Sequence, residues 1–316
     1  MKYAMLFPGQ GSQAVGMLGA HPDPVIAQTF QEASDVLGWD LAGLVREGPV
    51  EELNRTERTQ PALLAADIAV WRLWQQHCLS AGLPAPSALA GHSLGEYAAL
   101  VAAQCLDFAD ALKLVELRGR LMQSAVPEGT GGMAAVIGLD DAQIDALCAA
   151  CPVDGVLEPA NFNSPGQVVV AGHAGAIDWV LENAKAQGAR MAVRVPMSVP
   201  SHCSLLRGAA EQLFEQMAGI RFNAPVIPVA HNLDGRSGRA GDAVREALRD
   251  QLHRPVQWTQ LVQNLVGEGI GLFLECGPGK VLCGLSKRIV KDVPAIALED
   301  GAGFDKARAA LSGTPT

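Results

Sequence analysis

Residues 87–103 have the sequence Ser-Ala-Leu-Ala-Gly-His-Ser-Leu-Gly-Glu-Tyr-Ala-Ala-Leu-Val-Ala-Ala. The pattern Gly-x-Ser-x-Gly at positions 91–95 follows a short apolar run and precedes a run of helix-forming residues. Between a strand and a helix, this pattern forms a sharp turn in which glycines avoid clashes and the serine hydroxyl is exposed. We therefore predict a strand over 87–91, a helix over 94–103 and a nucleophilic Ser93, with the N–H of Leu94 directed at a developing oxyanion.

Apolar segments of strand-like and helix-like length alternate on both sides of this turn. A long helix is expected over 61–80, and another, capped by Asp107, extends to about residue 124. Further strands are expected at 3–7, 226–230, 272–275 and 295–298. Strands that alternate with helices predict an α/β fold with a mostly parallel sheet covered on both faces.

The middle of the chain follows a different order. The elements expected there are a strand, a helix, two strands, a helix and a strand, at 133–138, 140–150, 153–162, 167–171, 174–187 and 191–195. The order β-α-β-β-α-β is typical of ferredoxin-like domains. We predict a small subdomain of residues 128–198, inserted into a larger α/β subdomain formed by residues 1–127 and 199–316.

Composition excludes several classes of protein. Hydrophobic residues make up 49% and charged residues 18% of the 316 residues, which excludes a disordered chain. The net charge of −9 argues against nucleic-acid binding, and no apolar run approaches the ~18 residues of a membrane-spanning helix. The apolar stretch that ends at Pro8 is too short for a signal peptide, and seven cysteines are an odd number. We expect a cytoplasmic monomer with reduced thiols that binds neither nucleic acid nor membrane.

A nucleophilic serine needs a base, and the chain has seven histidines. His202 lies at an expected loop-to-helix junction where the chain re-enters the larger subdomain, and such junctions often carry catalytic residues. The residue pattern favours His202 and His231 equally. Between Ser93 and His202, no acidic residue stands at a strand end of the larger subdomain. We therefore predict a Ser–His dyad in which a carbonyl orients the imidazole.

Arg118 lies off the polar face of the expected helix 107–124. Its neighbours three and four positions away are Leu114, Val115, Leu121 and Met122. A guanidinium on an apolar stripe is costly without an anion to pair with. The pattern leaves two alternatives open: an internal ion pair with a core carboxylate, or a bidentate clamp for the carboxylate of a substrate.

Motifs for cofactors and metals are weak or missing. Gly9-x-Gly11-x-x-Ala14 loosely fits the dinucleotide-binding fingerprint, but residues 25–38 indicate a helix where that fold needs a second strand and an acidic residue. No P-loop and no His-Glu-x-x-His zinc motif occurs. Cys148 and Cys151 lie in an Ala-rich helical stretch, which favours packing over metal binding. We expect no cofactor and no metal.

Six motifs occur in an order that identifies a family. They are Phe-Pro-Gly-Gln-Gly-Ser-Gln (7–13), Gly-His-Ser-Leu-Gly-Glu-Tyr (91–97), Glu-Leu-Arg-Gly (116–119), Asn-Phe-Asn-Ser-Pro-Gly-Gln (161–167), Val-Pro-Ser-His (199–202) and Pro-Val-Gln-Trp (255–258). Together they resemble the malonyl-CoA:acyl-carrier-protein transacylases of dissociated fatty acid synthases, over nearly the whole chain. Polyketide-type acyltransferases and the transferase subunit of malonate decarboxylase are similar alternatives, but residues 199–202 resemble the free-standing fatty-acid enzymes best.

The resemblance implies an α/β-hydrolase-like larger subdomain and a ferredoxin-like smaller one, in agreement with the element order above. It implies that Ser93 accepts the acyl group and that His202 is its base. Gln10 and the backbone of Leu94 would form the oxyanion hole. For the remaining roles it implies that Arg118 holds the malonyl carboxylate and that the main-chain carbonyl of Gln257 orients His202.

The implied reaction is ping-pong transfer of malonyl from malonyl-CoA to the phosphopantetheine thiol of acyl carrier protein, in support of fatty acid synthesis. The phosphopantetheine belongs to the partner, and a tight cleft between the subdomains should keep water from the acyl-enzyme. A serine esterase or thioesterase is the alternative enzyme. Because the family's carrier protein is acidic, docking needs a basic face; Lys280, Lys287, Arg288 and Lys291 form a candidate, or else an ordinary solvated helix surface.

Overall fold

The computed structural model describes residues 1–197 and 199–313. Its larger sheet has five strands in the order β7-β2-β1-β8-β9, and every pairing is parallel. The strands are β1 (Ala4–Phe7), β2 (Ala88–Gly91), β7 (Val229–Ala230), β8 (Phe273–Glu275) and β9 (Ala295–Ala297). The predicted mixed fold with a mostly parallel sheet is confirmed.

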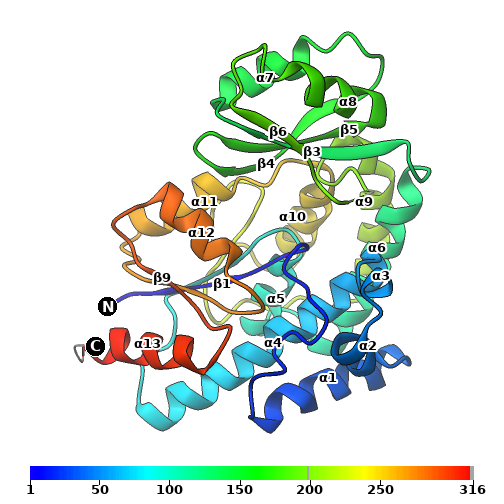
Figure 1. Cartoon of the computed structure of the whole chain (residues 1–316). Coiled ribbons are helices and arrows are strands. Elements are labelled where there is room, and N and C mark those ends of the chain that lie inside the picture. Colours follow the sequence, from blue (N-terminus) through cyan, green and yellow to red (C-terminus); the bar gives the residue numbers. More distant parts are fainter. Residues whose placement is uncertain (198, 314–316) are drawn as a thin grey trace.

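Helices cover both faces of this sheet (Figure 1). Met5 and Phe7 of β1 face a large apolar core with α1 and α4–α6, whereas Ala4 and Leu6 face a second core with α11 and α12. The helices of this part are α1 (Pro24–Leu37), α2 (Leu41–Glu47), α3 (Val50–Leu53), α4 (Thr56–Ala81), α5 (Gly95–Ala102), α6 (Phe108–Ala125), α9 (Arg207–Met217), α10 (Asp242–His253), α11 (Trp258–Gly267), α12 (Val281–Ile289) and α13 (Gly301–Ser312). Successive side chains of β1 point to opposite faces of the sheet, so this one strand packs against both helix layers.

The middle of the chain forms a separate antiparallel sheet in the order β4-β5-β3-β6, with α7 and α8 on its outer face (Figure 1). Its elements are β3 (Gly131–Ile137), α7 (Asp141–Ala149), β4 (Leu157–Ser164), β5 (Gln167–His173), α8 (Ala174–Asn183) and β6 (Met191–Arg194). This is the predicted β-α-β-β-α-β order, and it has its own apolar core. The division into 1–127 with 199–316 and 128–198 stays a prediction, and residues 198 and 314–316 lie outside the described residues.

Several predicted helix bounds were wrong; the helix expected over 174–187, for example, ends at Asn183. The helix expected from Pro61 begins at Thr56, because tertiary packing buries Thr56 and Thr59 and stabilises the turn before the proline. The helix expected from His202 begins only with a 3₁₀ turn at Ser204–Leu206. His202 itself has a φ of 61°, a left-handed conformation that no helix accepts. The candidate basic face is not confined to one helix, because α12 ends at Ile289 and Lys291 lies beyond it.

None of the helices formed by the described residues combines the length and the apolar character that crossing a membrane requires.

Candidate active site

Three neighbouring strands of the larger sheet end at the same edge, and their loops gather the polar residues of the site. Phe7 at the end of β1 pairs with Gly91 at the end of β2, so the loops that carry Gln10 and Ser93 lie side by side. Asn232 follows β7, the other neighbour of β2. Parallel α/β sheets bind ligands at this carboxyl edge.

The turn after β2 has the geometry predicted from the Gly-x-Ser-x-Gly pattern. Ser93 has a φ of 52°, which strains a residue with a side chain. A Cβ on Gly91 would overlap the carbonyl of Gly95, and a Cβ on Gly95 would overlap the carbonyl of Phe7. Asn232 braces the turn: its Oδ1 accepts the Ser93 N–H at 2.6 Å and its Nδ2 donates to the Gly91 carbonyl at 2.6 Å. The two glycines are therefore needed because backbone segments approach closely here.

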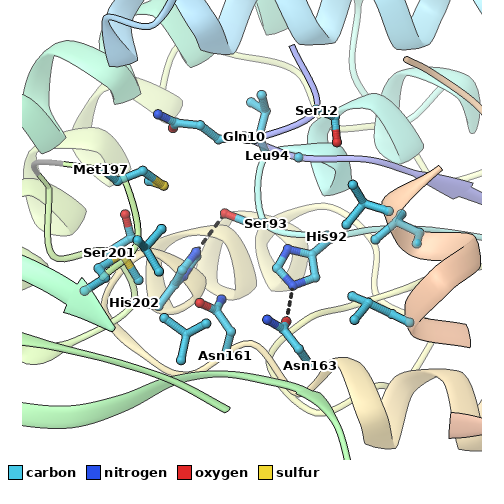
Figure 2. Close-up of a pocket in the computed structure, with 18 of the residues that line it drawn as sticks. Gln10, Ser12, His92, Ser93, Leu94, Asn161, Asn163, Met197, Ser201 and His202 are labelled. Atoms are coloured by element: carbon cyan, nitrogen blue, oxygen red, sulfur yellow. Dashed lines mark hydrogen bonds between the residues drawn. The ribbon is translucent and has the colours of Figure 1, made fainter. Parts of the chain in front are cut away.

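His202 is the histidine that contacts the serine. Its Nε2 lies 2.7 Å from Ser93 Oγ (Figure 2), and its Nδ1 lies 2.7 Å from the main-chain carbonyl of Gln251. A carbonyl only accepts, so Nδ1 carries the proton and Nε2 is free to accept the Ser93 hydroxyl proton. This is the geometry of a serine–histidine dyad with a carbonyl in the orienting position.

The orienting carbonyl is that of Gln251, and the prediction of Gln257 was wrong. Gln257 precedes α11, and its carbonyl accepts the Leu261 N–H at 2.9 Å in the first turn of that helix. Gln251 lies in the last turn of α10, where carbonyls have no partner within the helix. The next carbonyl, that of Leu252, accepts the His202 N–H at 3.2 Å. The C-terminus of α10 thus holds both the backbone and the ring of His202.

The surroundings of His202 favour a neutral imidazole. Burial lowers the pKa of His202 to about 3, and the positive charge of Arg118 acts in the same direction. The Gln251 carbonyl opposes this shift, because it accepts a hydrogen bond from the ring. Near neutral pH the ring therefore carries one proton, on Nδ1, and can act as a base.

The other candidate histidines have different partners. His92 Nε2 donates to Asn163 Oδ1 at 2.8 Å (Figure 2), and its ring packs against Trp258 with 5.2 Å between centroids. His231 is buried and its Nδ1 lies 2.6 Å from Glu96 Oε1. Of these three histidines, only His202 contacts Ser93, so the geometry favours His202 over His231 as the base.

Arg118 reaches the serine from α6, although it is only 1% exposed. Its terminal nitrogens lie 2.8 Å from Gln60 Oε1, 3.2 Å from Gln251 Oε1 and 3.3 Å from Ser93 Oγ. Within residues 1–197 and 199–313, Arg118 forms no ion pair, and its Nε has no hydrogen-bond partner. Burial lowers the pKa of the guanidinium. A buried cation with neutral partners is incompletely compensated, which favours the anionic-substrate alternative over an internal ion pair.

The proposed oxyanion donors face the same space. Leu94 follows the strained serine, and its N–H meets no acceptor among the described residues. Gln10 is half-buried, follows β1 and lies across the cavity from His202 (Figure 2). Both residues line the cavity around Ser93, and their role as oxyanion donors stays a prediction.

A cavity of about 200 Å³ surrounds Ser93 and lies between the two sheets. Helix α12 contributes Val281, Leu282 and Leu285 to one side. The smaller sheet and the segment after it contribute another part of the wall, with Met133, Asn161, Asn163, Val169, Val195 and Met197. Among the described residues, no three or more His, Cys, Asp or Glu side chains gather as metal ligands do.

Sequence reasoning missed the residues that support the site. Gln251, Gln60 and Asn232 contact Arg118, Ser93 or His202, yet none belongs to a motif with a known spacing. Burial of a polar residue in an otherwise apolar helix face is the one signal that marks Gln60 and Gln251.

Comparison with known proteins gives one consistent result. Residues 4–304 match the family described as the acyl transferase domain. A malonyl CoA-acyl carrier protein transacylase of Escherichia coli O157:H7 is 54% identical over 301 residues, covering 95% of this chain and 96% of the relative. Its counterpart in Bacillus subtilis is 38% identical over 302 residues, covering 95% and 94%.

Solved structures agree with the sequence comparison. An acyl carrier protein S-malonyltransferase from Vibrio cholerae superimposes with a TM-score of 0.93 at 52% identity, covering 97% of this chain and all of that one. A malonyl-transacylase solved in complex with a type II polyketide acyl-carrier protein superimposes with a TM-score of 0.94 at 51% identity, covering 99% and 100%.

Proposed function

The chain belongs to the acyl transferase family, among the malonyl CoA-acyl carrier protein transacylases, and we propose that it transfers malonyl from malonyl-CoA to the phosphopantetheine thiol of an acyl carrier protein. It is an acyltransferase. The proposed physiological role is supply of malonyl groups for fatty acid synthesis. The enzyme needs no cofactor of its own in this proposal, because the phosphopantetheine arrives with the carrier protein.

One observation carries the choice of substrate: the Arg118 guanidinium lies 3.3 Å from the nucleophilic oxygen of Ser93 and has only neutral protein partners. Malonyl has a free carboxylate one methylene from its thioester carbonyl. When Ser93 attacks that carbonyl, the carboxylate comes within reach of the guanidinium. A planar guanidinium binds a carboxylate through two parallel hydrogen bonds, so Arg118 selects an acyl group with a terminal anion.

In the first half-reaction, Ser93 Oγ attacks the thioester carbonyl while His202 Nε2 takes the hydroxyl proton. The oxyanion of the tetrahedral intermediate receives hydrogen bonds from the Leu94 N–H and the Gln10 side chain. The intermediate then collapses, the C–S bond breaks and the coenzyme A sulfur takes the proton from Nε2. The product is a malonyl ester of Ser93 and free coenzyme A.

The second half-reaction reverses these steps with a different thiol. The carrier's phosphopantetheine thiol gives its proton to His202 Nε2 and attacks the ester carbonyl. When the C–O bond breaks, Ser93 Oγ recovers that proton, and malonyl leaves as a new thioester. Water would compete as acceptor, and the apolar walls of the cavity, with Met133, Val195 and Met197, disfavour it.

Helix α12 is the proposed contact for the carrier protein. Its exposed side carries Lys287 and Arg288, and Lys280 precedes it. Its buried side contributes Leu282 and Leu285 to the cavity wall. An acidic partner bound to these cations would therefore lie next to the cavity that its prosthetic arm must enter.

Incubation with isotope-labelled malonyl-CoA, followed by intact-protein mass measurement, tests this function. We expect one malonyl adduct, which addition of carrier protein removes, and we expect none on Ser93→Ala because that variant has no comparable nucleophile. Ser12→Ala, which changes another serine of the cavity wall, is the matched control and should still be labelled. Labelled Ser93→Ala would refute the nucleophile, and release of malonate to water instead of carrier would support an esterase.

A further inference from the structure

Glu96, in the first turn of α5, is a buried carboxylate with no lysine or arginine partner among the described residues. It is 1% exposed. Its Oε1 lies 2.6 Å from His231 Nδ1, and its Oε2 accepts hydrogen bonds from the Asn232 N–H at 3.1 Å and from Gln251 Nε2 at 2.9 Å. A buried carboxylate is costly unless its lone pairs are used, and here three groups use them.

Two of these partners hold the catalytic groups. Asn232 Oδ1 accepts a hydrogen bond from the N–H of Ser93, the residue with the strained backbone. Gln251 has three contacts in the site: Nε2 donates to the Ser93 carbonyl at 2.9 Å, Oε1 accepts from Arg118 at 3.2 Å, and its main-chain carbonyl accepts from His202. Glu96 therefore contacts Asn232, which holds the turn of Ser93, and Gln251, which contacts both His202 and Arg118.

The chemistry of Gln251's two neighbours fixes the direction of its amide. A carboxylate only accepts hydrogen bonds and a guanidinium only donates them. With Glu96 on one side and Arg118 on the other, the amide satisfies both only when its NH₂ faces the carboxylate and its oxygen faces the guanidinium. In the flipped orientation, donor would face donor and acceptor would face acceptor, both in a buried site.

We infer that Glu96 is a positioning residue for the transfer reaction, acting through Gln251 and Asn232. Glu96 holds the Gln251 amide in the orientation that keeps Arg118 beside Ser93. Through the Asn232 N–H, it also contacts the residue that holds the turn of Ser93. His231 closes the far side of the carboxylate and contributes to the same support. The inference rests on the roles proposed above for Ser93, His202 and Arg118.

Glu96→Gln tests this inference, because the variant keeps the shape and removes an obligate acceptor. We expect acylation by malonyl-CoA to slow by roughly 10- to 100-fold, as small misplacements of reacting groups do. We also expect the preference for malonyl-CoA over acetyl-CoA to fall, because Gln251, one of the two amides that hold Arg118, is no longer fixed in orientation. Glu116→Gln is the matched control: Glu116 is a half-buried carboxylate of α6 that bonds Trp39 and Arg120, neither of which lines the cavity. It should keep wild-type kinetics.

A double-mutant cycle with Gln251→Met separates positioning from general stability. Gln251→Met keeps the main-chain carbonyl and removes the amide, so it should also lower acylation and selectivity. If Glu96 acts through that amide, Glu96→Gln with Gln251→Met should be no slower than Gln251→Met alone, apart from a small residual effect through Asn232. Effects that multiply fully in the double variant would overturn the inference.

Further outcomes separate this inference from the proposed function. A lower melting temperature with wild-type rates and selectivity, measured well below that temperature, would mean that Glu96 is only structural and would overturn the inference. If Glu96→Gln does not fold, Glu96→Asp serves instead, because its shorter carboxylate cannot keep the 2.9 Å bond to Gln251, and unchanged kinetics would again refute the inference. A wild-type enzyme that forms no malonyl adduct would refute the proposed function, and the inference with it.

Discussion

Arg118→Ala is the substitution that separates a carboxylate clamp from a structural arginine. The guanidinium is 1% exposed, and its hydrogen bonds go to Gln60, Gln251 and Ser93, which are all uncharged. Bound malonyl would be the missing anion. Acetyl has no carboxylate, so acetyl-CoA leaves the buried charge unpaired in the wild-type enzyme, and this penalty disfavours acetyl.

The magnitude follows from losing one partner of a buried charge pair. Such losses cost about 2–5 kcal/mol, and about 1.4 kcal/mol corresponds to a tenfold change. We therefore expect kcat/KM for malonyl-CoA to fall by roughly 30- to 5,000-fold in Arg118→Ala. Acetyl transfer should hold or rise, because the substitution also removes the unpaired charge, so the selectivity should narrow or invert.

The assay compares kcat/KM for malonyl-CoA and acetyl-CoA, with a thermal melt of each variant. Arg120→Ala is the matched control, since Arg120 lies on the same helix with its side chain 60% exposed and paired with Glu116. It should leave both rates unchanged. A parallel loss of both activities in Arg118→Ala, together with a lower melting temperature, would refute the clamp and indicate a structural role.

Four further predictions concern the proposed base His202 and the carrier protein. His202→Ala should slow acylation by roughly 10²–10⁴-fold in a stopped-flow acylation assay, and a near-normal rate would exclude His202 as the base. Because the pKa of His202 is lowered to about 3, the pH profile of kcat/KM should show no inflection near 6.5, and Arg118→Ala should move the acid limb upwards; an inflection near 6.5 in the wild type would contradict this. Because the pKa of His202 is lower in the folded than in the unfolded protein, the unfolded protein binds this proton at a higher pH. The free energy of unfolding should therefore decrease as the pH falls from about 6.5 towards 3. Urea titrations over this pH range should show a smaller decrease for His202→Ala than for the wild type. Reversing Lys287 and Arg288 to glutamate should raise KM for carrier protein and spare KM for malonyl-CoA, and an unchanged carrier KM would dismiss this surface.

Local sequence determined the turn of the nucleophile and the order of the elements. Gly91 and Gly95 specify the strained turn around Ser93, because a Cβ on Gly91 would overlap the carbonyl of Gly95 and a Cβ on Gly95 would overlap the carbonyl of Phe7 at the end of β1. The split β-α-β-β-α-β pattern was also visible, because strand and helix periodicities are local properties of a chain. The unusual position of Arg118 is also a local property, because the residues three and four positions away from it in the helix are apolar.

Tertiary structure alone decided which groups meet. The choice of His202 over His231, and the orienting carbonyl of Gln251 in place of Gln257, depend on where the C-terminus of α10 lies relative to the turn after β2. Gln251 contacts Ser93 across 158 residues of sequence, and Arg118 contacts Gln251 across 133. No local pattern encodes such contacts, because they arise from the packing of whole helices against the sheet, and the chemistry of the buried network follows from that packing.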